Sequence, residues 1–413
     1  MPGRNGLWER GARHNFGVWI AEYLKHQTNV PSNLLTLTNK EADRVTAARA
    51  VLATLQEYEP ILEELRRAST RPYARFNIDY SEENPFAILL PHLRVIKMTC
   101  RLVDIRATAA LSLGQTESAF ADLKLLMVLA DSLKQEPLLI SQLVRWACLN
   151  MGLGVFSEGA ADHRWSEAQL KELQAHFQSV DFLSDYARTL RAERGAGCTT
   201  IEWLQNAPYP AQLMSDLVGH NESEREYMGI RNVLLRLAPR GWFDWEQLNY
   251  ARTFQESILP VINVQTRQFN PAHNELAQKA LKKSFATPPA ANIWEHRFFS
   301  RMLLPALENS HRRMAYGQSL VDQATVVCAL ERYKLAQGQY PDQLATLAPE
   351  WIAKLPHDVI GGQPLKYQRT DDQFTLYSVG WNQEDDGGTL EFTSSGKHIE
   401  LASGDWVWPS TPQ

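Results

Sequence analysis

Apolar residues between about residues 38 and 284 recur at intervals of three and four, and this spacing predicts a series of amphipathic α-helices. Thr38 and Glu41 have the spacing of a capping box, so we expect the first of these helices to begin there. Two prolines and many polar residues interrupt the pattern at 69–85, which predicts an irregular crossing segment. The greater part of the chain is therefore expected to be helical.

The clearest helical unit covers residues 90–114, 115–137 and 138–156, with Gly114 as the expected left-handed cap of its first helix. A helix, a short glycine turn and a second helix resemble a hairpin of the tetratricopeptide type. No 34-residue period repeats along the chain. We therefore expect an irregular helical bundle or a repeat-like solenoid.

Further helices are predicted for residues 165–284. Ser166 and Gln169 have capping-box spacing, and a long helix is expected over 242–269 with a kink at Pro260. Adjacent prolines in 285–296 indicate a linker. This linker predicts a helical domain over 1–290 and a second domain over 291–413.

The last hundred residues change from helical spacing to alternation. A helix from about 300 to 337 should end at Gly338, because glycine is the usual left-handed cap and a proline follows at 341. Two alternating runs around a polar turn then predict a hairpin over 364–379, and residues 404–408 predict a third strand. The fold class expected is mainly α, with a small α+β module of one long helix and a three-stranded antiparallel sheet.

Four short motifs in this module carry a resemblance to a known family. In chain order they are Tyr340-Pro341, Leu355-Pro356-His357-Asp358, Gly362-Gln363-Pro364 and Tyr377-Ser378-Val379-Gly380. Over about 310–408 the chain resembles the globular part of the major pseudopilin of type II secretion systems. The whole chain is similar to large helical proteins of planctomycete and verrucomicrobial type that carry such a module. Pseudopilins polymerise through a helix at their amino terminus, whereas this helix is internal, so we do not expect a pilus.

The resemblance also implies a metal site, because the loop after the corresponding strand binds calcium in the secretion proteins. The matching residues are Ser378, Gly380, Asp385, Asp386 and Asp405. Calcium takes six to eight oxygen ligands, which carboxylates, carbonyls and waters can supply. Calcium is therefore an expected cofactor, and the alternative is a solvated Asp/Gly turn.

Polar residues in apolar stretches of the helical region are further candidates. Arg145 and Glu193 either form a satisfied internal pair or line a ligand groove. The alternating Trp406 and Trp408 predict core packing, or else an exposed stacking platform. The chain has no signature of a zinc protease, a serine hydrolase elbow or a P-loop, and residues 158–163 hold only two acids and a histidine at a helix end.

Composition narrows the class of protein. Hydrophobic residues at 44% and charged residues at 22% are typical of a globular chain, and a net charge of -5 gives no basic footprint for nucleic acid. No run of 18 apolar residues occurs, so no membrane span is expected. The four separated cysteines favour buried free thiols over disulfides. The start of the sequence lacks the apolar core of a signal peptide, so the protein is either cytoplasmic or a cell-envelope or periplasmic protein whose leader is missing from this chain.

These observations lead to an expected function without a reaction. We expect a non-enzymatic binding or assembly protein of the cell envelope, in which a helical scaffold and a pseudopilin-like module act on a protein partner. One alternative is an enzyme whose site is assembled from separate helices. The other is a cytoplasmic helical-repeat adaptor.

Overall fold

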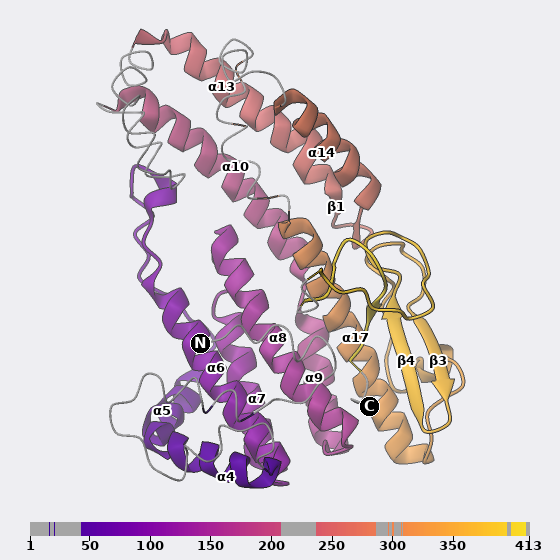
Figure 1. Ribbon diagram of the computed structural model, residues 1–413. Helices are drawn as coiled ribbons and strands as arrows, with labels where there is room; N and C mark the ends of the chain where they lie inside the picture. Colours follow the sequence, from indigo (N-terminus) through magenta and orange to yellow (C-terminus); the bar gives the residue numbers. More distant parts are fainter. Residues whose placement is uncertain are drawn as a thin grey trace.

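The computed structural model describes residues 43–207, 237–285, 309–394 and 398–409, together with Phe16, Ile20, His296, Ser300 and Leu307. These residues form a mainly α-helical protein with a small antiparallel sheet near the carboxyl end, as the sequence pattern predicts (Figure 1). The helices are α4 (Arg44–Leu55), α5 (Glu59–Ser69), α6 (Pro91–Ser112), α7 (Thr116–Asp131), α8 (Leu139–Ala161), α9 (Glu167–Ser179), α10 (Phe182–Asn206), α13 (Arg240–Thr253), α14 (Pro271–Phe285) and α17 (Ser310–Gln337). Short single turns of helix are η2 (Gln56–Tyr58), η3 (Pro85–Ala87), η5 (Phe254–Ile258), η6 (Leu259–Val261) and η8 (Leu344–Leu347).

Most predicted helix ends have the expected local chemistry. The capping box at Ser166 is formed with Gln169, and Gly114 and Gly338 have φ of 72° and 78°, the left-handed conformation that glycine adopts without strain. The box predicted at Thr38 lies outside the described residues. Helix α4 is the first helix whose bounds the structure describes. Its N-cap is Asp43, whose carboxylate accepts the Thr46 N–H at 3.1 Å.

The helix predicted over 242–269 is wrong in its second half. After Thr253 the chain passes through the π-helical turn η5 and the 3-10 turn η6, and then forms a two-stranded hairpin of β1 (Ile262–Asn263) and β2 (Gln268–Phe269). Pro260 lacks the N–H that a helix needs at that position. The flanking β-branched residues favour extended backbone, so the chain turns at the proline instead of bending through it.

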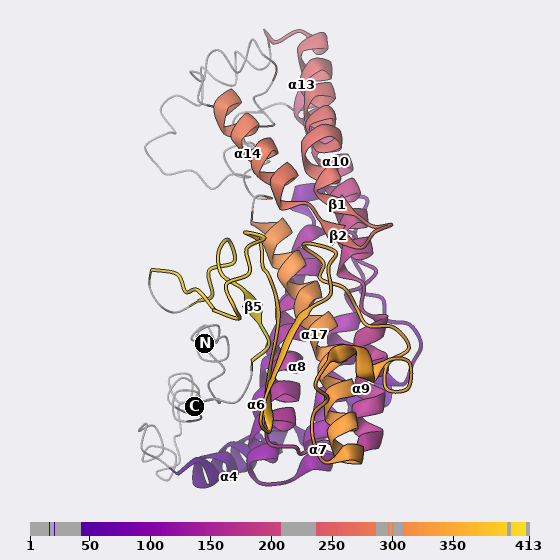
Figure 2. The same cartoon turned by 90° about the vertical axis from the view of Figure 1, so that its right-hand side faces the viewer.

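Helix α17 lies between two layers. One layer consists of α8 and α9, and the other is the sheet (Figure 2). Helices α10, α13 and α14 extend away from these layers as an arm. Twenty of the 28 residues of α17 are buried, including a run from Met314 to Glu331. The core that contains them runs from Leu62 in α5 to Trp408 after the last strand. The predicted linker at 285–296 falls almost wholly outside the described residues, and on both sides of it the chain contributes to this one core.

The sheet has the predicted three antiparallel strands, β3 (Lys366–Thr370), β4 (Gln373–Ser378) and β5 (Trp406–Val407), in the order β3-β4-β5. Trp406 is fully buried and Trp408 is 3% exposed, so both rings pack in the core. Tyr316 of α17 stacks edge-on against Trp406 at 5.5 Å, and Gln323 donates to the Trp406 carbonyl at 2.9 Å. The sheet therefore contacts the face of α17 that carries Tyr316 and Gln323.

Within the described part of the chain, α8 is the one helix long and apolar enough to cross a membrane by length and composition alone. Its most apolar 18-residue window has a mean hydropathy of 1.3, and 67% of that window is buried inside the protein. The contacts of α8 with α6, α7 and α17 account for this apolar character as core packing.

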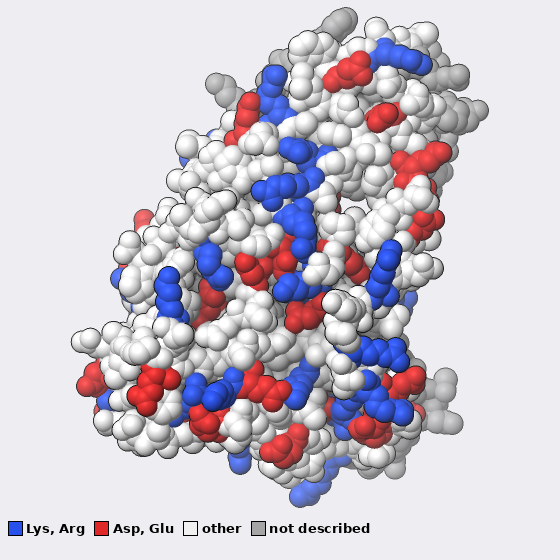
Figure 3. All heavy atoms as spheres, turned by 180° about the vertical axis from the view of Figure 1, so that it is seen from behind, with Lys and Arg blue, Asp and Glu red and all other residues white. Residues whose placement is uncertain are grey.

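On the face drawn in Figure 3, charges of both signs are interspersed over the lower half, and a run of basic side chains follows the middle of the upper half.

Candidate functional site

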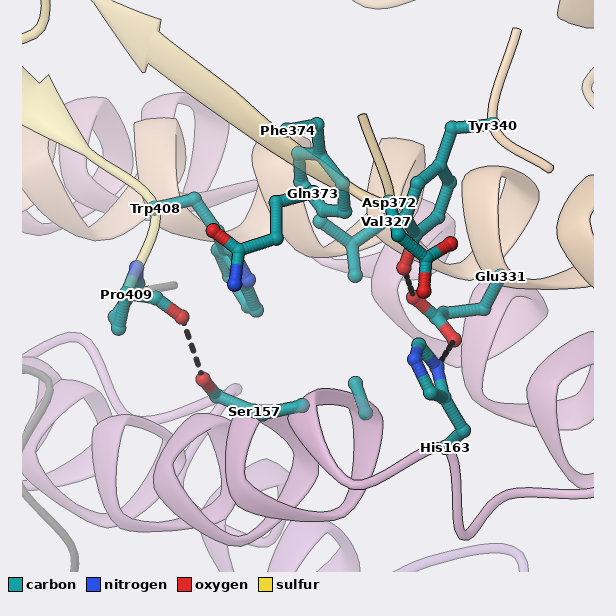
Figure 4. Close-up of a pocket in the computed structure, with 12 residues that line it drawn as sticks. Ser157, His163, Val327, Glu331, Tyr340, Asp372, Gln373, Phe374, Trp408 and Pro409 are labelled. Carbon is teal, nitrogen blue, oxygen red and sulfur yellow. Dashed lines mark hydrogen bonds and ion pairs between the residues drawn. The ribbon is translucent and has the colours of Figure 1, made fainter. Parts of the chain in front are cut away.

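A pocket of about 180 Å³ lies where the helical region meets the carboxyl-terminal module (Figure 4). Its walls come from the end of α8, the second half of α17, the β3–β4 turn and the chain after β5. They are made by Ser157, Ala160, Ala161, His163, Val327, Glu331, Tyr340, Asp372, Gln373, Phe374, Trp408 and Pro409. Ligand pockets usually measure about 300–1,000 Å³. This one therefore suits a small chemical group better than a whole metabolite.

Two helix ends bring the polar residues of the pocket together. The last residue of α8 is Ala161, and His163 follows with φ of 50°, which turns the chain away from the helix axis. Gly338 ends α17 in the same left-handed way and brings Tyr340 back beside the last turns of that helix. His163 and Glu331 consequently meet although 168 positions separate them.

The Glu331 carboxylate is the centre of a hydrogen-bond network. It is 5% exposed. Its Oε1 accepts the hydroxyl of Tyr340, and its Oε2 lies 2.8 Å from Nδ1 of His163. A buried carboxylate needs such partners because its desolvation is otherwise costly. The network therefore gives both oxygens of Glu331 a hydrogen-bond partner.

Lys334 closes the network on its solvent side. Its Nζ lies 2.7 Å from Oδ1 of Asp372 and 3.1 Å from Nε2 of His163, and it sits 4.5 Å from the ring centroid of Tyr340. An ammonium group can only donate, so Nε2 of His163 accepts and its Nδ1–H donates to Glu331. The hydrogen-bond network thus assigns His163 as neutral with the proton on Nδ1.

The same contacts explain the protonation behaviour of the site. The hydrogen bond to Glu331 raises the pKa of His163 above its usual 6.5, against the opposing effects of burial and of Lys334. Burial, together with the charge of Glu331, raises the pKa of Tyr340, which therefore remains a donor at neutral pH. Lys334 lowers the pKa of Asp372, so this carboxylate is ionised.

The other half of the pocket is apolar and aromatic. The ring of Phe374 meets that of Tyr340 edge-on at 4.9 Å, and Val327 and Trp408 complete the wall (Figure 4). Ser157 faces this half, and its hydroxyl donates to the carbonyl of Pro409 at 3.0 Å.

Ser157, His163 and Glu331 are the residue types of a hydrolytic triad, but they are not connected as one. The base of a triad hydrogen-bonds to the serine hydroxyl. Here that hydroxyl donates to the Pro409 carbonyl, and the histidine nitrogen that a serine would use accepts from Lys334. The arrangement is a preorganised polar pocket without an activated serine.

The structure places Arg145 and Glu193 in separate networks. The guanidinium of Arg145 has no exposed surface, and it pairs with Asp185 at 2.7 Å and with Asp131 at 3.3 Å. Glu193 accepts the backbone N–H of Leu139 at 2.8 Å, and burial raises its pKa. Leu139 is the first residue of α8, so Glu193 satisfies a helix N-terminus. Among the described residues, the partners of these two side chains are therefore different, and Arg145 and Glu193 do not pair with each other.

The acids of the predicted calcium site gather at one end of the sheet, where protein donors already bind them. Oδ1 of Asp385 accepts the hydroxyl of Tyr377 at 2.9 Å, and Oδ2 pairs with the Lys366 ammonium at 2.8 Å. Asp386 accepts the amide N–H of Asn382 at 3.2 Å. An ammonium group therefore stands beside Asp385, where the resemblance implies a metal.

The remaining residues of the predicted calcium site differ in whether they have an oxygen atom free to bind the ion. The Ser378 hydroxyl donates to Asp358 at 2.9 Å, and Gly380 lies so close to the next loop that an added Cβ would be 2.3 Å from the Gly404 carbonyl oxygen. Oδ2 of Asp405 accepts the N–H of Gly388 at 2.7 Å, whereas its buried Oδ1 has no hydrogen-bond partner among the described residues. In the described part of the chain, no three histidine, cysteine or acidic side chains are grouped as metal ligands. The fit to calcium is therefore partial, with Oδ1 of Asp405 as the free oxygen.

No family model, curated protein or solved structure matches the chain. The pseudopilin resemblance therefore remains a prediction from the motifs quoted above.

The sequence pattern did not predict the pocket around Glu331. Its only signals were a histidine at the end of a predicted helix and a glutamate directly after the short apolar run 326–330. Neither signal indicated the other, because only the fold places them side by side.

Proposed function

We propose that this protein is a non-enzymatic binding or assembly protein, in which the helical region and the carboxyl-terminal module together receive a small group of a protein partner. The observation that carries this proposal is the pocket between α8, α17 and the β3–β4 turn. Its walls come from both regions, so it exists only while they are packed together.

The state of the polar groups supports binding. Each oxygen of Glu331 and each ring nitrogen of His163 already has a partner, so the site needs little reorganisation when a ligand arrives. Interfaces between proteins obtain much of their affinity from single side chains that fill small pockets. A pocket of about 180 Å³ matches that use.

Site-specific photocrosslinking in cells tests this function. A photoreactive residue in place of Gln373 lies at the pocket, whereas the same residue at the exposed Gln368 of β3 is a control on the same hairpin. We expect one dominant product from position 373 and none from position 368. The pocket-filling variant Ala161→Phe should remove the product, and Ala196→Phe, a similarly half-buried alanine on α10, should leave it. A product that survives Ala161→Phe contradicts the proposal.

The cell envelope is the proposed location, and a calcium-stabilised loop is proposed for the module. Both proposals are supported by the resemblance to the secretion pseudopilin. Oδ1 of Asp405 would be the first ligand available to the ion, and Asp385 would have to exchange the Lys366 ammonium for it. When bound, calcium would cross-link the loop to the last strand. A cytoplasmic adaptor would use the same pocket and differ only in compartment.

One observation favours a second candidate function, an enzyme whose site is assembled from separate helices. His163 is half-exposed at the pocket and is oriented by a buried carboxylate, as many general acid–base histidines are. Turnover of ester, amide or phosphoester substrates that is abolished in His163→Gln and kept in the surface variant His398→Gln would favour this candidate. Equal turnover in both variants would exclude His163 as its base.

A further inference from the structure

We propose that the pocket recognises the cationic side chain of a lysine or arginine on the partner. This inference rests on the proposed function, because it names the chemistry of the group that the same pocket receives. It follows from the charge of the walls, from the rings that surround the cavity and from the position of one ammonium group of the protein itself.

The first step concerns charge. Two carboxylates, Glu331 and Asp372, line the pocket, and no lysine or arginine is among the described residues that line it. Lys334 is not one of the lining residues, and its ammonium neutralises one of the two, Asp372. Above the pKa of His163 the imidazole is neutral, and the cluster then retains one negative charge. A cation can compensate this charge, whereas an anion is repelled by it.

The second step concerns the aromatic side chains. Tyr340, Phe374 and Trp408 line the cavity from three different segments (Figure 4). The face of an aromatic ring attracts a cation, and cages of such rings bind ammonium groups. The hydrocarbon stem of a lysine or arginine would at the same time cover the apolar surface of Val327.

The third step is the position of the Lys334 ammonium. It is 4.5 Å from the Tyr340 ring centroid and 2.7 Å from a carboxylate oxygen of Asp372. The protein thus already places an alkylammonium group against a ring and an acid at the edge of this pocket. A partner cation would meet the same chemistry and would compete with Lys334 for Asp372.

The network also makes the recognition dependent on pH. Among the described residues, the charged groups that act on His163 are Glu331, Lys334 and Asp372, and Tyr340 shares the Glu331 carboxylate with it. A proton on Nε2 of His163 would cancel the remaining negative charge and break the hydrogen bond from Lys334. The pocket should therefore bind cations at pH 8 and release them at pH 5.5.

Calorimetric titration of the full-length protein with four capped amino acids tests the proposal. The probes are the N-acetyl methylamides of lysine, arginine, leucine and glutamate, at pH 8 and low ionic strength. At least one of the two cationic probes should bind roughly tenfold more tightly than the leucine probe, and the glutamate probe should not bind. The cationic preference should disappear at pH 5.5.

Three variants separate this explanation from others. Asp372→Asn should weaken binding of the cationic probe several-fold, and Asp371→Asn, the neighbouring acid of the same turn that is not in the wall, should leave it unchanged. Lys334→Met should strengthen binding, because it removes the internal competitor. The thermal midpoint of each variant checks that it is folded.

Several results would overturn the proposal. They are equal affinity for the leucine probe, tighter binding of the glutamate probe, and no binding of any probe at millimolar concentration. Weaker binding of the cationic probe in Lys334→Met would show that Lys334 does not compete with it, and this result would also overturn the proposal. The crosslinking experiment does not depend on the charge of the partner, so a crosslink that persists while the cationic probes fail would leave the proposed function intact.

Discussion

Two clusters of charge in this protein each have a buried central group, and they differ in whether that group lines a pocket. One surrounds Arg145 inside the helical region, where the guanidinium has no exposed surface. The other surrounds Glu331 at the pocket. That carboxylate is buried, its partner His163 is 44% exposed, and Asp372, which pairs with Lys334 in the same network, is 74% exposed. The first cluster joins α8 to α10 and, through Asp131, to α7, whereas Glu331 and Asp372 of the second line the pocket and can meet a ligand.

The comparison shows why a buried charge is a poor guide to function when only its sequence neighbourhood is known. Arg145 and Glu331 both occur in apolar stretches of helix. Arg145 faces Asp185 and the ring of Phe182, so its charge is used within the core. Glu331 faces the junction of two regions. Access, which depends on the packing of distant segments, distinguishes the two.

The largest expected effect is that of removing the guanidinium from the core cluster. Arg145→Ala leaves Asp185 buried without its main partner, and the loss of one member of a buried ion pair costs about 3–5 kcal/mol. Urea unfolding should show a decrease of this size, while Arg188→Ala, the exposed partner of the same acid, should change stability by less than about 1 kcal/mol. Equal effects of the two variants would remove the distinction between core and surface charge.

The next largest expected effect is an increase in stability on addition of calcium. It concerns a third group of charges, the acidic loop with Asp385 and Asp386. If the loop binds the ion, calcium at a hundred times its Kd stabilises the native protein by about 2.7 kcal/mol. Thermal unfolding of the full chain should then have a higher midpoint with millimolar calcium than with chelator. Asp405→Asn should abolish this difference, and Asp371→Asn, outside the loop, should keep it. An unchanged midpoint in the unmutated protein means that the acidic loop is a solvated turn.

Glu331→Gln should have an intermediate effect, because the amide keeps the shape of the side chain and loses its charge. Hydrogen bonds to charged groups contribute about 1.5–3 kcal/mol, and two of them end on this carboxylate. A decrease in that range is expected in urea unfolding. Nuclear magnetic resonance titration should also show that the pKa of His163 falls, since Glu331 is the largest cause of its increase. A pKa of His163 that stays raised would show that another group is responsible.

The smallest expected effect is the pH dependence that His163 contributes. Its pKa is raised in the folded protein, so the stabilisation is complete below pH 6.5 and is lost as pH rises through the folded value. Unfolding measured from pH 6 to 8.5 should show a steeper decline of stability in the unmutated protein than in His163→Asn. Burial raises the pKa of Asp322 to about 7, and this acid shifts stability in the same direction at lower pH. His163→Asn therefore serves as the reference, because it keeps the contribution of Asp322. Identical pH profiles of stability for this variant and the unmutated protein would contradict a raised pKa of His163.

Local signals in the sequence determined most of the secondary structure. The three- and four-residue spacing, the capping box at Ser166 and the glycines at 114 and 338 predict helix ends that the structure contains. Alternation predicts the hairpin of β3 and β4. These features depend on residues within a few positions of one another. They can therefore be recognised without knowing which distant segments pack against them. The prediction failed at Pro260, where a kinked helix and a hairpin are both compatible with the sequence.

Only the tertiary structure decided which charged groups meet. His163 lies 168 positions before Glu331, and the spacing of residues along either helix contains no information on that contact. The burial of α17 from both sides brings the end of α8 and the β3–β4 turn to the same place. Hydrophobic burial is not directional, so it determines that this helix lies inside but not what lies beside it. The packing of the surrounding helices and sheet determined the neighbours of Glu331, and with them the pocket.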